Sequence, residues 1–165
     1  MEITPIQMFR REMEREAQTT KKFLSIIPED KYEWQPHPKS MKLIQLVTHI
    51  AELPTWFELI LTTNGIDFEA NEYKPKQINN NAELMAHFEE SLENGLASLD
   101  KYGDVDLWQL WPISSGAMVF TNNPRLDEMR NTASQVVHHR AQLGVYLRLL
   151  NVPIPGSYGP SSDEM

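Results

Sequence analysis

The apolar residues of this chain recur at three- and four-residue intervals in four segments, a spacing that predicts amphipathic helices. The first predicted helix begins at Thr4, with Pro5 in its first turn and Gln7 as the capping-box partner of Thr4. Pro28 ends this helix, because proline disrupts a helix interior. The first helix is therefore predicted from its own start and stop signals.

The other three helices are predicted over residues 40–64, 80–103 and 123 to about 151, each with an apolar stripe. Pro54 lies inside the second of them, so we expect a kink there that frees the carbonyl of Ile50 from its usual hydrogen bond. Four amphipathic helices with one apolar stripe each predict a single helical bundle around one core.

Two segments do not follow the helical pattern. Residues 104–122 hold two apolar, β-prone runs around Gly116, which predicts a short β-hairpin between the third and fourth helices. Residues 152–165 are too rich in proline and glycine for a helix. We therefore predict an all-α protein, a four-helix bundle domain over residues 1–151, with a tail that packs on the same domain or on a partner subunit.

Composition and charge exclude several classes of protein. The 165 residues carry a net charge of −8, which argues against binding to a nucleic-acid backbone. The absence of cysteine excludes disulfides, thiolate ligands and a cysteine nucleophile. No apolar run is long enough for a signal peptide or a membrane span, so we expect a cytoplasmic protein that contacts no membrane.

Three polar residues form a candidate metal site. Gln135 and His139 are four residues apart and share one helix face, and His49 lies on a second predicted helix. Imidazoles from facing helices can build an open site for a divalent metal. The alternative is that each histidine is a surface residue or a satisfied core residue, which is the more common case for a histidine taken alone.

Four further residues are candidates for the surroundings of this site. Glu52 lies one turn beyond His49 and is a ligand, a general base or, as the favoured interpretation, a solvated charge. His138 either donates to a ligand or is solvated, and Gln142 follows the second candidate histidine by three positions. Arg140 is flanked by apolar residues and needs an acidic partner if it is buried.

These residues also carry a resemblance to a known family. The stretches concerned cover residues 36–40, 46–49, 138–149 and 152–164, and the most specific of them is the run His138-His139-Arg140-Ala141-Gln142-Leu143. In these stretches the chain resembles the DinB family of DinB/YfiT-like proteins over nearly its whole length.

The resemblance implies a four-helix bundle with long crossover connections, commonly dimeric, that holds a divalent metal such as nickel or zinc. The family's ligands are one histidine on the second helix and a His-x-x-x-His pair on the last. Carried over to this chain, they fall on His49, Gln135 and His139. The glutamine departs from the pattern and is a weaker, neutral ligand, so the resemblance leaves a weak or metal-free site open.

The resemblance further implies a metal-dependent enzyme that acts on a small molecule, either a transferase that uses a low-molecular-weight thiol or a hydrolase. The alternative is a non-catalytic helical bundle whose degenerate metal site serves ligand binding or a stress-related scaffold role. In both cases we expect a homodimer.

Overall fold

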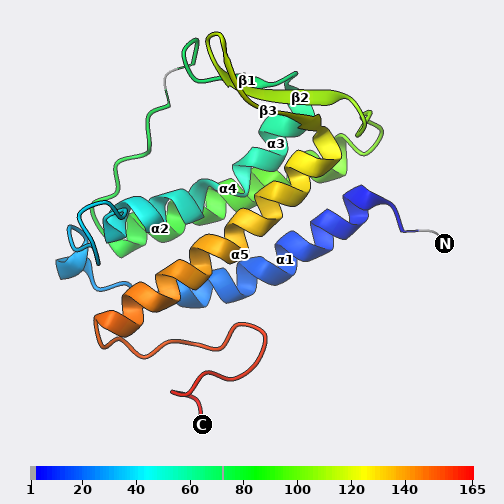
Figure 1. Cartoon of the computed structure of the whole chain (residues 1–165). Coiled ribbons are helices and arrows are strands. Elements are labelled where there is room, and N and C mark those ends of the chain that lie inside the picture. Colours follow the sequence, from blue (N-terminus) through cyan, green and yellow to red (C-terminus); the bar gives the residue numbers. More distant parts are fainter. Residues whose placement is uncertain (1–2, 72) are drawn as a thin grey trace.

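The computed structural model describes residues 3–71 and 73–165, so residues 1, 2 and 72 of the predicted domain 1–151 lie outside the described residues. Long helices lie side by side, and a small sheet covers one end of them (Figure 1). The elements are α1 (Pro5–Leu24), a 3-10 turn (Glu29–Lys31), α2 (Leu43–Glu52), α3 (Thr55–Thr62), β1 (Ile66–Asp67), α4 (Asn81–Lys101), β2 (Leu110–Ser115), β3 (Met118–Pro124) and α5 (Arg125–Leu149).

The prediction of an all-α four-helix bundle is wrong. The described residues form five α-helices and a three-stranded mixed sheet with the strand order β1-β2-β3. The predicted hairpin is present as the antiparallel pair β2–β3, and Gly116 adopts a φ of 56° at its turn. The strand that the sequence did not predict is β1, which pairs in parallel with β2 through Ile66 and Ile113.

The fifth helix arises because the predicted second helix is broken, and not only kinked, at Pro54. Ser91 of α4 fills the break: its hydroxyl donates to the carbonyl oxygen of Glu52 (3.1 Å) and accepts from the backbone N–H of Thr55 (3.0 Å). Gly95, one turn further along α4, lets the two segments approach closely, since a Cβ there would lie 2.4 Å from the carbonyl oxygen of Pro54. A neighbouring helix thus satisfies the backbone groups that the break exposes.

Local helix signals are largely confirmed. Thr4 and Gln7 form the predicted capping box of α1, with reciprocal hydrogen bonds of 3.2 and 3.0 Å. Asn80 caps α4 by accepting from the backbone N–H of Glu83. The first helix nevertheless ends at Leu24, before the predicted stop at Pro28, and the second begins at Leu43 after Lys42 instead of after Ser40.

Two apolar clusters form the core. One joins α1, α2, α4 and α5 and includes fully buried Leu43, Ile50 and Leu143. The other lies beneath the sheet, where Trp111 of β2 packs near Met129 of α5. Both α2 and α3 contact α4 and α5. The candidate site lies where these two helices meet α5.

The C-terminal segment 152–165 contains no helix and runs back beside α5 and α1 (Figure 1). Its contacts within the chain centre on Arg140 of α5, which is 1% exposed. The guanidinium lies 2.5 Å from the carboxylate of Glu16 on α1, so this buried arginine has the acidic partner that the sequence argument required. The Tyr158 hydroxyl donates to Glu16 and accepts from Arg140.

Candidate functional site

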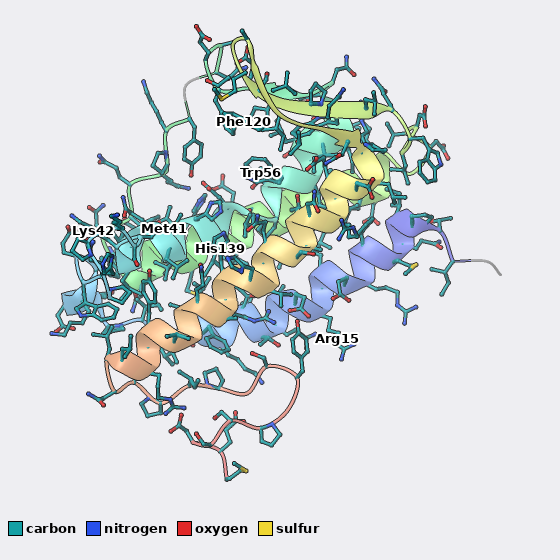
Figure 2. All side chains as sticks on the ribbon, viewed as in Figure 1. Arg15, Met41, Lys42, Trp56, Phe120 and His139 are labelled. Atoms are coloured by element: carbon teal, nitrogen blue, oxygen red, sulfur yellow. The ribbon has the colours of Figure 1, made fainter. Side chains whose placement is uncertain are left out.

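The structure brings His49 of α2 and His139 of α5 together. Their ring centroids are 4.7 Å apart and the rings are nearly perpendicular, with an interplanar angle of 80°. Figure 2 shows His139 in the space between α5 and α2. Two imidazoles from facing helices therefore lie at one point of the surface, as the sequence pattern predicted.

One ring nitrogen of each imidazole is already engaged. Nδ1 of His49 lies 2.7 Å from Oε1 of Glu52, and Nδ1 of His139 lies 2.8 Å from Oε1 of Gln142. Ionised carboxylate and amide carbonyl oxygens only accept hydrogen bonds, so each Nδ1 carries the proton. In the neutral form of each ring the lone pair is therefore on Nε2.

The surroundings keep His139 neutral. Burial, the largest cause, lowers its pKa, and the neighbouring imidazoles of His49 and His138 lower it further, against the opposing effect of the hydrogen bond that His139 donates to Gln142. A neutral imidazole with Nδ1 protonated is the form in which Nε2 can bind a metal ion.

Glu52 is not the solvated charge that the sequence favoured. Its side chain is 13% exposed, and besides His49 it accepts from the hydroxyl of Tyr73, which donates to both carboxylate oxygens at 2.5 and 2.7 Å. Burial and the Glu52 carboxylate raise the pKa of Tyr73, so the phenol stays protonated and donates. Glu52 thus fixes the ring of His49 and is itself fixed by Tyr73.

Gln135 and His138 lie on α5 beside the imidazole pair, and both are exposed. They line a cavity of about 560 Å³ together with His49, and the ring of His138 is 4.9 Å from that of His139. Arg140, by contrast, faces α1 and the C-terminal segment and does not line this cavity. Of the candidates around the site, Glu52, Gln142 and His138 are at the imidazole pair and Arg140 is not.

The donor set fits a divalent ion only in part. Two imidazoles offer Nε2, and Gln135 offers a neutral amide oxygen on the same cavity. Throughout residues 3–71 and 73–165, no group of three or more His, Asp or Glu side chains is arranged to hold a metal ion. The site is thus a pair of candidate metal ligands without a strong third donor.

His49 of the imidazole pair borders a large cleft. A second cavity, of about 820 Å³, also borders His49 and extends along α2 to the segment 73–79. Trp56 of α3 lines both cavities and lies beneath the sheet in Figure 2. Cavities of this size hold small organic molecules.

Sequence reasoning did not find two residues of this cleft. Tyr73 lies in an irregular connection without periodicity, so only the folded chain shows that it reaches Glu52. Thr121 is one residue of a short strand, and it lines the smaller cavity. Neither position carries a local signal that would have singled it out.

A bundle of helices with a contacting pair of imidazoles, one of which borders two cavities, defines this chain as a helical-bundle protein with a candidate metal site. The family model described as the DinB family matches residues 4–165. The chain therefore belongs to the DinB family, in agreement with the resemblance found in its sequence. A comparison with curated proteins found no match.

Solved structures show the same fold. A DinB-like protein of Bacillus subtilis superposes with a TM-score of 0.69 at 17% identity, covering 91% of this chain and 97% of that one. A DinB-like protein of Bacillus cereus gives a TM-score of 0.64 at 17% identity, covering 91% of this chain and 95% of the other. Of the helices in the described part of the chain, none is both long and apolar enough to cross a membrane.

Proposed function

We propose that this DinB-family protein binds one divalent metal ion through Nε2 of His49 and His139, with Gln135 as a weak third ligand, and acts on a small molecule in the adjoining cleft. Nickel and zinc are the ions that suit imidazole ligands of this kind. Homodimerisation and a cytoplasmic location stay predictions.

The observation that carries this proposal is the occupation of both Nδ1 atoms. Glu52 accepts from Nδ1 of His49 at 2.7 Å, and Gln142 accepts from Nδ1 of His139 at 2.8 Å. The lone pair on each Nε2 is therefore the one that can bind a metal ion. Metal-binding histidines commonly have this arrangement, in which the distal nitrogen donates to a carboxylate or carbonyl oxygen.

A divalent ion at this position supplies Lewis acidity, which lowers the pKa of a thiol or of a water molecule that it binds. The chain's own contribution is to orient the imidazoles through Glu52 and Gln142 and to shape the cleft through Trp56. Because the chain has no cysteine, a thiol nucleophile has to come from a substrate. Thiol transfer and hydrolysis are accordingly the two reactions to screen.

The test is the metal content of protein purified without a tag, chelator or nickel resin, followed by zinc and nickel titration in a calorimeter. We expect about one ion per chain, lost in the double variant His49→Ala, His139→Ala. His37→Ala is the matched control, since His37 is exposed and outside the cleft. Metal content and activity that survive the double variant would overturn the proposal.

A non-catalytic role is the second candidate, and Gln135 is the observation that favours it. A glutamine in place of an imidazole leaves two strong ligands, and two ligands bind an ion much more weakly than three. If wild-type protein takes up neither zinc nor nickel at micromolar concentration, the cleft serves ligand binding without metal chemistry.

A further inference from the structure

The far end of the smaller cavity contains a buried carboxylate with no cationic partner. Glu128 of α5 is 4% exposed and lines this cavity. Its oxygens accept only from the side-chain amides of Asn123 (2.8 Å) and Asn131 (3.3 Å). Among the described residues, no lysine, arginine or histidine nitrogen lies within 4.0 Å of it.

The nearest cations along the chain are engaged elsewhere. Arg125, also 4% exposed, donates to neutral oxygens, among them the carbonyls of Ile60 (2.9 Å) and Thr63 (2.8 Å). Arg130 borders the cavity but is exposed and donates to Asn131. A buried carboxylate that is not paired with a cation is costly, so its retention requires a compensating contact.

A second residue that lines this cavity carries an unpaired polar group. The hydroxyl of Thr121 on β3 is buried and has no hydrogen-bond partner among the described residues. The indole of Trp56 on α3 lines the cavity between the two ends. A carboxylate, an orphan hydroxyl and an aromatic face together form the surroundings that proteins use for an ammonium group.

From this arrangement we infer that the cavity binds a small molecule that carries a primary ammonium group, with Glu128 as its counter-ion and Thr121 as an acceptor. Glu128 precedes Gln135 by seven residues, which is about 10 Å along a helix. His139 lies one further turn along α5, eleven residues from Glu128, so the ammonium group binds about 16 Å along the helix from the imidazole pair. This inference adds a substrate class to the proposed function. It rests on the proposed function only in assuming that the other end of the substrate reacts at the imidazole pair.

The helix N-terminus offers a competing explanation for Glu128. Acidic side chains in a first turn stabilise a helix through its dipole, and Asp127 lies in that turn as well. Asp127 does not line the cavity. The variants Glu128→Gln and Asp127→Asn each remove one charge from this turn, so comparing them separates ligand binding from the dipole effect.

The probes are hexylammonium and the neutral 1-hexanol, titrated into chelator-treated protein and followed by calorimetry. We expect hexylammonium to bind at least about tenfold more tightly than hexanol, and Glu128→Gln to abolish this preference. Asp127→Asn should leave it unchanged. Thr121→Val keeps the shape of the side chain and should weaken hexylammonium binding about threefold to tenfold.

Three results would overturn the inference: equal affinity for the two probes, undiminished hexylammonium binding in Glu128→Gln, or no binding of either probe at millimolar concentration. If Glu128→Gln does not fold, the Thr121→Val titration decides in its place. The protein is metal-free in this experiment, so hexylammonium binding does not depend on the metal site. The double variant His49→Ala, His139→Ala can be titrated with hexylammonium in the same way. Failure of the metal site and failure of the ammonium site therefore give different results.

Discussion

The hydroxyl of Tyr73 donates to both carboxylate oxygens of Glu52, at 2.5 and 2.7 Å, although the tyrosine is half exposed and lies 21 residues further along the chain. Glu52 in turn accepts from Nδ1 of His49. An irregular connection thereby fixes the orientation of an imidazole on α2. The candidate metal site depends on this relay as well as on its ligands.

The first prediction concerns Glu52→Gln. The substitution removes the negative charge that stabilises the protonated Nδ1 of His49, so we expect zinc affinity to fall about 10- to 100-fold, as is typical for residues that orient a metal ligand. Competition titration with a chromogenic chelator measures the change. Glu93→Gln, an exposed site on α4, is the control, and equal affinities in the two variants would contradict the relay.

The second prediction is a gain of affinity. Gln135→His places a third imidazole one helical turn from His139 on the cavity that His49 also lines, so we expect zinc to bind at least about tenfold more tightly. Ser134→His adds an imidazole to the adjacent position, about 100° away around the helix, and should have little effect. Equal gains in both variants would show that position 135 is not special.

The third prediction concerns the ion pair between Arg140 and Glu16. Glu16→Gln leaves a buried guanidinium without its counter-ion, and we expect the free energy of unfolding to fall by about 3–5 kcal/mol. Urea denaturation at neutral pH measures it. Asp163→Asn removes a more exposed pair with Arg148 and should cost much less. Similar losses of unfolding free energy in the two variants would mean that burial does not determine how much each ion pair stabilises the fold.

The fourth prediction is a pH dependence of stability. Burial lowers the pKa of His87, whose two ring nitrogens have no partner among the described residues. The unfolded chain therefore binds a proton at higher pH than the folded one, and this part of the stability is complete above about pH 6.5 and is lost as the pH falls toward the folded-state pKa. We expect His87→Leu to flatten the decline between pH 7 and 5. A slope as steep as that of the wild type would assign the decline to other groups.

Sequence patterns predicted what short-range chemistry determines. The capping box of Thr4 and Gln7 and the cap at Asn80 depend on residues three positions apart, and both are present. Pro54 was identified as a disturbance, but a broken helix in place of a kinked one requires Ser91 and Gly95 of another helix. The strand β1 has two residues, too few for any periodicity, and exists because β2 offers it an edge.

The site divides in the same way. Helical spacing and the family resemblance indicate His49, Gln135 and His139 as candidate metal ligands. In the structure the two histidines are in contact. Glu128 lies in the first turn of α5, where a carboxylate stabilises the helix dipole, and the sequence does not show that this carboxylate lacks a cation. The partner that fixes Glu52, Tyr73, comes from a connection that has no local signal.

The break at Pro54 places two residues that line the cleft on different helices. His49 belongs to the segment before it and Trp56 to the segment after it, although both line the same two cavities. A continuous helix would couple these side chains rigidly, so that any change in the angle of one would move the other. With a joint between them, substitutions in α3 can reshape the space that a ligand enters while the imidazole keeps its place. The shape of the cleft and the position of the imidazole can thus vary separately, which makes α3 the segment to diversify when a new ligand is sought.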